Sequence, residues 1–483
     1  MEARDPARVA GGPDPRAFTG SSAGALALLC SVQLLLLVDF SIVNVALPRI
    51  ETALDFGRLG VQWVVSAYAL AFGGLLLLGG RLSDLLGRRR MLVFGLVLFG
   101  IASLGGAVAM GPGVLVAMRA LQGAGAALIA PAVLSIITTG FAEGAARNRA
   151  IGWFSAASAS GFAVGVLLGG ILTEIFDWRS VFYVNLPAVI IAIAGAYRLL
   201  GGHAPTRERR RYDVPGALLA TAGSTGVIYG LSLIPAKGWG GLLWAAIGLG
   251  LLAGFVVVES RSASPLVPLG IFRQRAVSVA NLASLIVPGL VGAAVLLLSL
   301  FLQGVQERSV LEAGLAFLPV GLAVMILGPI SAAVANRFGP KIVCIGGAAL
   351  VTAGMLLLSR ITPTASYFEY LLPGLVVTGF GFTAFFATSA MCATAGIPEH
   401  QQGLAGGLLN TSVQFGTALW IAVMLTIGQS YANKHQAAGA AAQTDGYAWA
   451  FTIGGIVGLA TAVLLALALP ATRVPHPEPQ TST

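Results

Sequence analysis

The chain has 483 residues, of which 57% are hydrophobic and only 10% are charged, and its mean hydropathy is +0.87; one soluble core could not bury so much apolar surface. The net charge of +9 does not indicate a nucleic-acid partner, because the basic residues lie in short segments between apolar runs and are better explained as topology signals. The alternating pattern of a membrane β-barrel is missing, so we expect an all-α polytopic membrane protein, whose 64 glycines suit close helix packing in lipid.

The chain opens with a Pro-, Gly- and Arg-rich segment, residues 1–20, which we expect to be a disordered cytoplasmic tail. The first apolar run follows, and its residues 34–48 have the sequence LLLLVDFSIVNVALP. Asp39 is the one charged residue between Ala17 and Leu47. An acid at membrane depth costs roughly 2.5–3.5 kcal/mol on insertion scales, so it is seldom kept without a use. The sequence therefore predicts a proton or cation site at Asp39; the alternative is a buried acid paired for structural reasons.

Runs with few or no charges then recur, each near the roughly 20 residues that a spanning helix requires. They predict fourteen membrane helices, at residues 23–47, 61–80, 91–110, 113–137, 150–172, 180–199, 214–234, 240–258, 277–304, 312–335, 342–359, 368–392, 404–429 and 447–469. An even number of spans places both termini on the same side. The alternative is twelve helices, if 214–234 and 240–258 do not insert.

The Lys and Arg residues indicate which side that is. With the N-terminus inside, cytoplasmic segments hold 20 of the 28 basic residues, the outer loops hold seven, and Arg119 lies within the fourth helix. By the positive-inside rule, we expect a multi-pass protein of the cell membrane with both termini in the cytoplasm.

An internal similarity supports a division into two halves. Residues 80–89 (GRLSDLLGRR) follow the second predicted helix, and residues 332–341 (AAVANRFGPK) follow the tenth, with a glycine, a polar residue and a final cation in register. Parallel repeats of this kind are typical of transporters. We expect a tail at 1–20, a six-helix bundle at 21–200, a linker with two additional helices at 201–275, a second six-helix bundle at 276–470, and a cytoplasmic tail at 471–483.

Five motifs in order resemble those of one family, the major facilitator superfamily, in its fourteen-helix drug:proton antiporter branch. They are LVDFSIVNVALP, GGRLSDLLGRRR, RALQGAGAA from Arg119, WRSVFYVNLP (178–187) and SPLVPLGIFRQR (264–275). The resemblance implies the major facilitator fold with two extra helices. It also implies proton-coupled, alternating-access export of hydrophobic or amphiphilic small molecules, such as drugs, antibiotics or secondary metabolites.

The helix-five motif departs from the family pattern. The branch normally has a Gly-Pro pair there, and Val166 stands in place of the proline. The glycines Gly161, Gly165 and Gly169 still form a ladder along one helix face, but the kink of a proline is missing. The departure leaves the direction of transport open, and plain helix packing is an alternative role for the ladder.

The loop after the second helix carries the predicted cytoplasmic gate motif, made of Gly80, Asp84, Gly87, Arg88 and Arg89. A carboxylate and cations at the ends of two helices can hold those helices together. We interpret the cluster as an inner gate latch; the alternative is that its arginines only set the topology.

Asp39 and Arg119 form the predicted proton-coupling pair. Burial favours the neutral form of a carboxyl group, whereas a nearby cation favours the charged form. A movable relation between the two residues would therefore let the conformation change the proton affinity. The alternative is that Arg119 pairs with backbone carbonyls or another group. All four histidines lie in predicted loops or tails, so no histidine relay is expected.

No enzyme, metal or cofactor motif stands out, so we expect a transporter that is driven by the proton gradient. Its partners would be protons, a hydrophobic small-molecule substrate and the lipid bilayer, without nucleic acid, and it would act as a monomer. The substrate-cavity candidates, by location alone, are Gln33, Asn44, Trp63, Phe301, Gln303, Phe385 and Gln414. Two alternatives remain: an uptake symporter or uniporter of the same superfamily, and a membrane sensor that does not transport.

Overall fold

In the computed structural model, the structure describes residues 18, 21–142, 145–201, 213–237, 239–262, 265–394, 397, 399–434 and 439–470. Their regular structure is helical, apart from a β-bridge between Phe18 and Leu200. Fourteen helices of this described part are long and apolar enough to cross a membrane. The predicted all-α class and the predicted number of spans are therefore confirmed.

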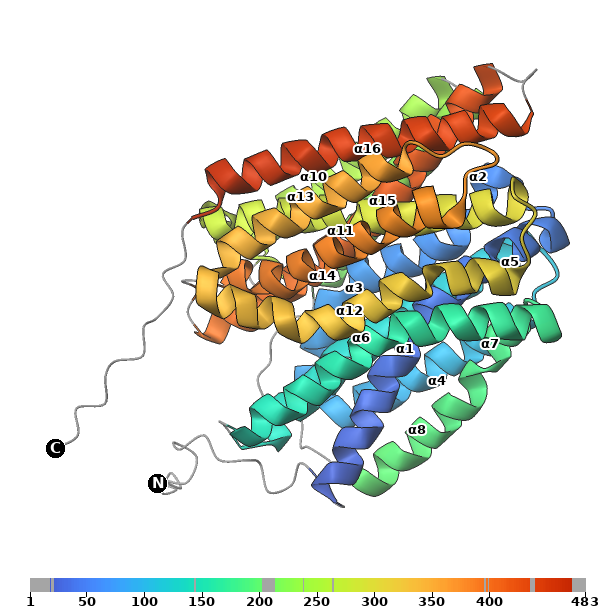
Figure 1. Ribbon diagram of the computed structural model, residues 1–483. Coiled ribbons are helices and arrows are strands. Elements are labelled where there is room, and N and C mark those ends of the chain that lie inside the picture. Colours follow the sequence, from blue (N-terminus) through green and yellow to red (C-terminus); the bar gives the residue numbers. More distant parts are fainter. Residues whose placement is uncertain are drawn as a thin grey trace, which may run out of the picture.

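The first part of the chain forms the helices that are drawn in blue to green in Figure 1. They are α1 (Ser22–Leu54), α2 (Arg58–Val61), α3 (Trp63–Leu86), α4 (Arg88–Ala107), α5 (Pro112–Gly140), α6 (Ala145–Ile175), α7 (Ser180–Tyr183) and α8 (Asn185–Leu199), followed by α9 (Val214–Lys237) and α10 (Trp239–Arg261).

The second part of the chain begins with a short 3₁₀ helix and is drawn in yellow to red (Figure 1). Its elements are η2 (Leu269–Arg273), α11 (Arg275–Gly304), α12 (Val310–Phe338), α13 (Pro340–Leu358), the π-helical turn η3 (Tyr367–Leu371), α14 (Leu372–Thr394), α15 (Glu399–Lys434) and α16 (Ala440–Ala468).

Several helices extend beyond the predicted ranges, such as α3 to Leu86, α15 over Glu399–Lys434 and α16 from Ala440, and the first and sixth predicted helices differ most in form. The first continues through Pro48 to Leu54 instead of ending at residue 47, and it stops at Asp55, which has a left-handed φ of 52°. The predicted helix 180–199 is divided into α7 and α8 around Val184. Pro187 explains the division, because a proline has no N–H to donate to the carbonyl four residues earlier.

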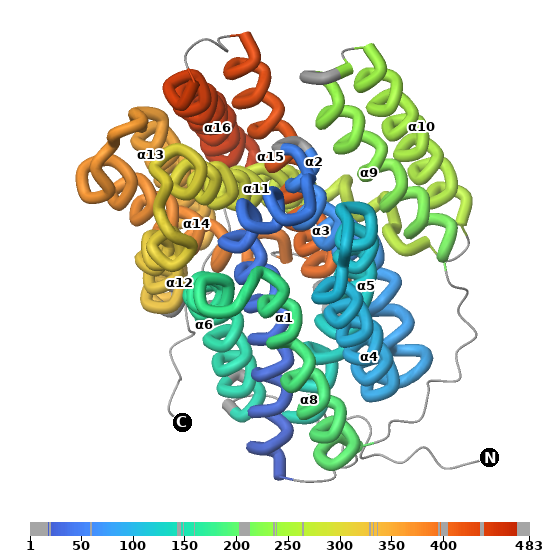
Figure 2. The backbone as a smooth tube through the Cα atoms, turned by 90° about the vertical axis from the view of Figure 1, so that its right-hand side faces the viewer, coloured from blue at the N-terminus to red at the C-terminus, as the bar shows by residue number. Residues whose placement is uncertain are grey.

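The helices form two groups with a pair beside them (Figure 2). In one group α1 packs on α6 and α8, while α5 packs on α3 and α4; in the other α11 packs on α15, and α13 packs on α14 and α16. The groups meet where α12 lies against α6, α11 against α1, and α15 against α3. Side chains of α11 reach the backbone of α1 at this meeting point: Ser299 Oγ donates to Asn44 O at 3.1 Å, and Gln303 Nε2 donates to Val45 O at 3.0 Å.

Helices α9 and α10 pack mainly against each other, and α9 also contacts α3 and α15. Gln62 Nε2, next to the start of α3, donates to Ser232 Oγ at 2.8 Å, and Thr426 Oγ1 of α15 donates to Leu231 O at 3.2 Å. Helix α9 is thus hydrogen-bonded to both groups.

Two glycines turn the chain at matching positions of the internal repeat. Gly87 joins α3 to α4 with a φ of 100°, and Gly339 joins α12 to α13 with a φ of 89°. Side chains disfavour positive φ, which explains why glycine stands at both turns.

The predicted terminal tails lie outside the described residues, except for Phe18. Its ring lies 5.2 Å from the ring of Phe141, centroid to centroid, just after the end of α5. This residue of the predicted tail therefore packs onto the helices.

Candidate functional site

An ion pair between α1 and α5 lies at the centre of the candidate site. Arg119 Nη1 lies 2.7 Å from Asp39 Oδ2, and both side chains are 0% exposed. The structure thus brings the two residues of the predicted coupling pair together. In a region of low dielectric constant, each charge offsets much of the other's cost of burial.

Two amide side chains complete the surroundings of the Asp39 carboxylate. Gln122 Nε2 donates to Asp39 Oδ1 at 3.1 Å, and Asn185 Nδ2 donates to the same oxygen at 2.7 Å. With Arg119, the carboxylate accepts hydrogen bonds from three side chains on α5 and α8. Oδ1 thus accepts from both amides, while Oδ2 accepts from Arg119.

Arg119 is held on several sides. Its Nε donates to Val64 O at 2.8 Å, and its Nη1 donates to Gln122 Oε1 at 2.9 Å. The guanidinium also lies over the ring of Tyr68, 4.5 Å from the centroid. Both interpretations of Arg119 are thus partly met, since it pairs with the predicted acid and with a backbone carbonyl.

Ser103 of α4 fixes the orientation of the two amides. Its hydroxyl donates to Phe99 O at 2.8 Å and accepts from Gln122 Nε2 at 2.8 Å and from Asn185 Nδ2 at 3.5 Å. Because the hydroxyl proton is used on the backbone, Ser103 can only accept from the amides, which must present their NH₂ groups to it.

We call these six buried residues the Asp39 network: Asp39, Tyr68, Ser103, Arg119, Gln122 and Asn185. They come from α1, α3, α4, α5 and α8. Gly123 lets α5 approach α3 closely, because a Cβ there would lie 3.0 Å from the backbone carbon of Tyr68. Two polar atoms of the network, Arg119 Nη2 and Asn185 Oδ1, have no hydrogen-bond partner in the described part of the chain. Chemically, the network places one carboxylate against one guanidinium at a site where neither side chain is exposed.

The residues of the predicted gate motif lie at the turn between α3 and α4. Arg88 Nε lies 4.0 Å from Asp84 Oδ1, and the Asp84 side chain is 65% exposed. Arg88 also donates to Thr139 Oγ1 of α5, and Arg89 Nη1 donates to Leu200 O at 2.9 Å, just after α8. These contacts tie α4 to α5 and to the end of α8, and the role of the motif as a gate latch stays a prediction.

The predicted glycine ladder faces α1. A Cβ on Gly161 would lie 2.5 Å from Leu37 Cβ, one on Gly165 would lie 2.7 Å from Val38 O, and one on Gly169 would lie 2.6 Å from Ile42 O. The ladder thus permits the backbones of α1 and α6 to approach closely. Val166 is buried, and its carbonyl lies near Gly314 at the contact with α12.

The seven substrate-cavity candidates are distributed over several interfaces. Trp63 packs on Tyr229 of α9 with ring centroids 5.9 Å apart, and Gln414 Cβ lies close to Gly73 of α3. Phe301 and Phe385 are fully buried, and Gln303 is engaged with α1 as described above. Asn44 Nδ2 donates to Phe40 O at 2.8 Å, and Gln33 is half-buried. Their role in substrate binding stays a prediction.

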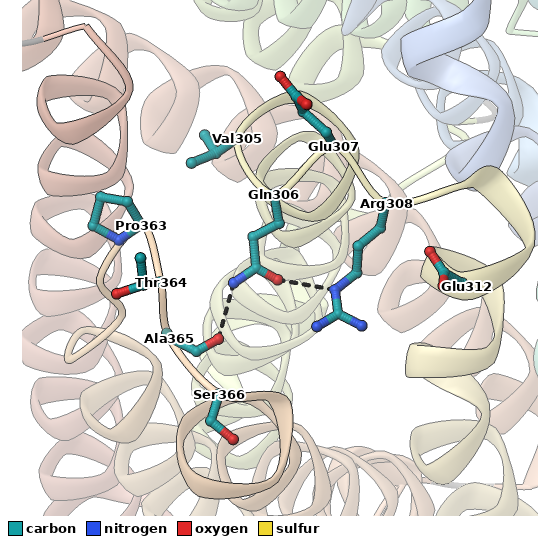
Figure 3. A pocket seen from close by; sticks show the side chains of 9 residues that line it. All are labelled: Val305, Gln306, Glu307, Arg308, Glu312, Pro363, Thr364, Ala365 and Ser366. Atoms are coloured by element: carbon teal, nitrogen blue, oxygen red, sulfur yellow. Dashed lines mark hydrogen bonds between the residues drawn. The ribbon is translucent and has the colours of Figure 1, made fainter.

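An open cavity of about 550 Å³ lies elsewhere, between the α11–α12 loop and the loop before η3 (Figure 3). Gln306 crosses it, donating from Nε2 to Ala365 O at 2.9 Å and accepting from Arg308 Nε at 3.1 Å. It is lined by Val305–Arg308, Glu312 and Pro363–Ser366, which include none of the seven candidates.

Sequence reasoning identified the two charges of the network but not its neutral members. Gln122 and Asn185 belong to the motifs RALQGAGAA and WRSVFYVNLP, whose pattern assigns them no role, and Ser103 and Tyr68 lie in apolar runs outside the five motifs. A signal was available, because polar side chains inside predicted spans usually face other helices and find partners there. Which of them meet Asp39 depends on the packing of five helices.

The comparisons with known proteins agree on one family. The Major Facilitator Superfamily model matches residues 29–421. The chain is 37% identical over 472 residues to the puromycin resistance protein pur8 of Streptomyces alboniger, which covers 95% of this chain and 91% of that relative. It is 38% identical over 458 residues to the cephamycin export protein CmcT of Amycolatopsis lactamdurans, covering 93% and 94% respectively.

A likeness to solved structures concerns the fold alone. A POT family transporter, PepTSo, superposes with a TM-score of 0.66 at 16% sequence identity, covering 93% of this chain and 99% of that one.

Proposed function

The chain belongs to the major facilitator superfamily, and on that premise we propose that it exports hydrophobic or amphiphilic small molecules, antibiotics among them, in exchange for protons. It is a multi-pass membrane transporter and not an enzyme. The similar proteins named for puromycin resistance and for cephamycin export support an export function.

The observation that carries the proposal is the buried ion pair of Asp39 and Arg119. Protonation removes the charge of Asp39, so the attraction that holds Arg119 at 2.7 Å falls. Arg119 then remains as a buried cation without its counter-charge, which is unfavourable. The arrangement of the Asp39 network is therefore expected to change when the proton binds.

A path from this pair to the interface between the helix groups exists along α1. Asp39 lies five and six residues before Asn44 and Val45, whose carbonyls accept hydrogen bonds from Ser299 and Gln303 of α11. A movement of α1 at Asp39 would therefore also act on α11. Alternating access requires such a link between proton binding and the relative position of the two helix groups.

The organisation that we propose has two six-helix bundles, at residues 21–200 and 276–470, with α9 and α10 in a linker at 201–275. The repeated turns at Gly87 and Gly339 support the two halves. The distribution of Lys and Arg favours a cell-membrane protein with both termini in the cytoplasm. We further propose that the protein acts as a monomer.

Transport into inverted membrane vesicles tests the proposal. The vesicles contain the full chain, and a panel of ethidium, Hoechst 33342 and puromycin is offered from outside, with and without an acidic lumen. We expect accumulation of at least one compound that needs the pH difference. Loss of preloaded compound that is driven by the same gradient would instead indicate uptake. The experiment therefore determines the direction of transport, which the missing proline at Val166 leaves open.

A further inference from the structure

We propose that Asn185, the first residue of α8, is a positioning residue that holds Asp39 in its charged form and so sets the pH at which the transporter releases its proton. This inference rests on the proposed function, in which Asp39 is the proton-binding group. It assigns a role to the neutral residue of the segment WRSVFYVNLP that reaches the centre of the protein.

The geometry of the contact favours a strong hydrogen bond. Asn185 Nδ2 lies 2.7 Å from Asp39 Oδ1, whereas Gln122 Nε2 lies 3.1 Å from the same oxygen. Hydrogen bonds to an ionised acceptor are shorter and stronger than those between neutral groups. Asn185 and Asp39 are both 0% exposed, so water does not compete for the contact.

A third residue, Ser103, helps to set the orientation in which the Asn185 amide turns its NH₂ group towards Asp39. Ser103 Oγ spends its proton on Phe99 O and accepts from Asn185 Nδ2 at 3.5 Å. An amide rotated by 180° would place its oxygen opposite both the carboxylate and the Ser103 acceptor, which is unfavourable. Ser103 thus helps to keep the NH₂ group of Asn185 on Asp39.

The other end of the amide shows that Asn185 is not simply a packing residue. Asn185 Oδ1 is buried and has no hydrogen-bond partner in the described part of the chain. Asn281 of α11, another buried asparagine, uses both ends: its Nδ2 donates to Val277 O at 2.8 Å, and its Oδ1 accepts from Ser412 Oγ at 2.9 Å. A buried amide oxygen without a partner lowers stability. We therefore infer that Asn185 is kept for the hydrogen bond that its NH₂ group donates to Asp39.

Few other groups can set the proton affinity of Asp39. Arg119 of α5 is paired with it, and Tyr68 of α3 lies over that guanidinium. Helices α4 and α8 bring the neutral Ser103 and Asn185. The other charged residues of the helices around Asp39 lie towards helix ends: Arg49, Glu51, Arg81, Asp84, Arg88–Arg90, Arg147, Arg149, Glu174, Arg198, Arg275, Glu312 and Arg337.

The test measures the pH dependence of transport by the full chain in inverted vesicles. The probe is the compound of the panel that the wild type accumulates fastest, and the pH is varied on the outer face of the vesicle, which corresponds to the cytoplasmic face. Export requires Asp39 to release its proton there. Asn185→Leu removes a donor to the carboxylate, so the proton is held more tightly, and we expect the pH of half-maximal transport to rise by about one unit.

Asn281→Leu is the control, because it removes a buried asparagine of another helix, α11, whose hydrogen bonds go to Val277 and Ser412 and not to Asp39. It is expected to leave the pH midpoint at the wild-type value. Asn185→Ser is the second variant: its shorter side chain loses the contact with Asp39 but keeps polarity, and it should shift the midpoint in the same direction.

The outcomes separate this inference from the proposed function. An unchanged midpoint in both Asn185 variants, or failure of both to insert, overturns the positioning role while leaving proton-coupled export intact. Absence of pH-driven transport of the whole panel by the wild type, or an Asp39→Asn variant that still accumulates the probe against its gradient, contradicts the proposed function instead.

Discussion

Asp39 and Arg119 form an ion pair of 2.7 Å in which neither side chain is exposed to solvent. The pair joins α1, which contacts the second helix group, to α5, which lies within the first. Such a pair is sensitive to any change of charge, because a buried partner left alone carries the full cost of its desolvation. A proton that binds at Asp39 therefore has consequences for packing and not only for charge.

Asp39→Asn is expected to destabilise the protein as well as uncouple it. The substitution leaves Arg119 as an uncompensated buried cation, and loss of one partner of a buried pair costs about 3–5 kcal/mol. An unpaired aspartate in a membrane helix would be expensive to bury, so its replacement by asparagine would not harm folding; the pairing with Arg119 at 2.7 Å reverses this effect. Thermal unfolding of the purified variant in detergent measures the effect.

A double variant is the control for this prediction. Asp39→Asn with Arg119→Gln removes both charges, so it should recover a large part of the lost stability while remaining inactive in coupled transport. An Asp39→Asn variant as stable as the wild type would show that Arg119 is compensated by other groups.

Gly165→Ala is expected to weaken the packing of α1 on α6. The added methyl group would lie 2.7 Å from Val38 O and would also meet the hydroxyl of Ser41. Overpacking of this kind costs about 1–3 kcal/mol. Gly152→Ala on the same helix meets nothing within 4 Å and should not destabilise. Thermal unfolding is measured for both variants. Equal unfolding midpoints would mean that the ladder does not fix the distance between α1 and α6.

Gly87→Ala is expected to strain the turn between α3 and α4. Its φ of 100° is rarely adopted by residues with a side chain, and such strain costs on the order of 1–3 kcal/mol. Gly111, at the start of α5, has an extended φ of −163° and open space, so Gly111→Ala serves as the control. Expression and thermal stability are measured for both, and a Gly87 variant that matches its control would argue against the strain.

Asp84→Asn is expected to lower transport with little change in stability. Asp84 is 65% exposed and lies 4.0 Å from Arg88, and exposed ion pairs contribute about 1 kcal/mol or less. Any large loss of transport would then reflect its proposed role in the gate. Initial transport rates are compared with surface expression, and Arg90→Gln, which changes an exposed neighbour, is the control. Unimpaired transport by Asp84→Asn would refute the latch.

The sequence was sufficient for the number of spans and for the two charged residues of the site, because apolar runs of bilayer length and rare intramembrane charges are local signals. It did not predict that α1 passes through Pro48 to Leu54. Pro48 leaves the carbonyl of Asn44 without its helical donor, and Ser299 of α11 donates to that carbonyl, a tertiary contact that is not visible in a local pattern. Ser103 and Asn185 are neutral, and their place beside Asp39 follows from how α4 and α8 pack on α5 and α1. Residues of that kind require the assembled structure.

The most direct test of proton-coupled export at Asp39 compares uphill transport by the wild type with that of the Asp39→Asn, Arg119→Gln double variant, in which neither charge of the pair remains. Both proteins are reconstituted in vesicles with an imposed pH difference, and the internal concentration of the probe is followed against its external concentration. The account predicts that the wild type accumulates the probe above equilibrium, whereas the double variant only equilibrates it. Accumulation by the double variant to the wild-type level would contradict the account and place the coupling site elsewhere in the protein.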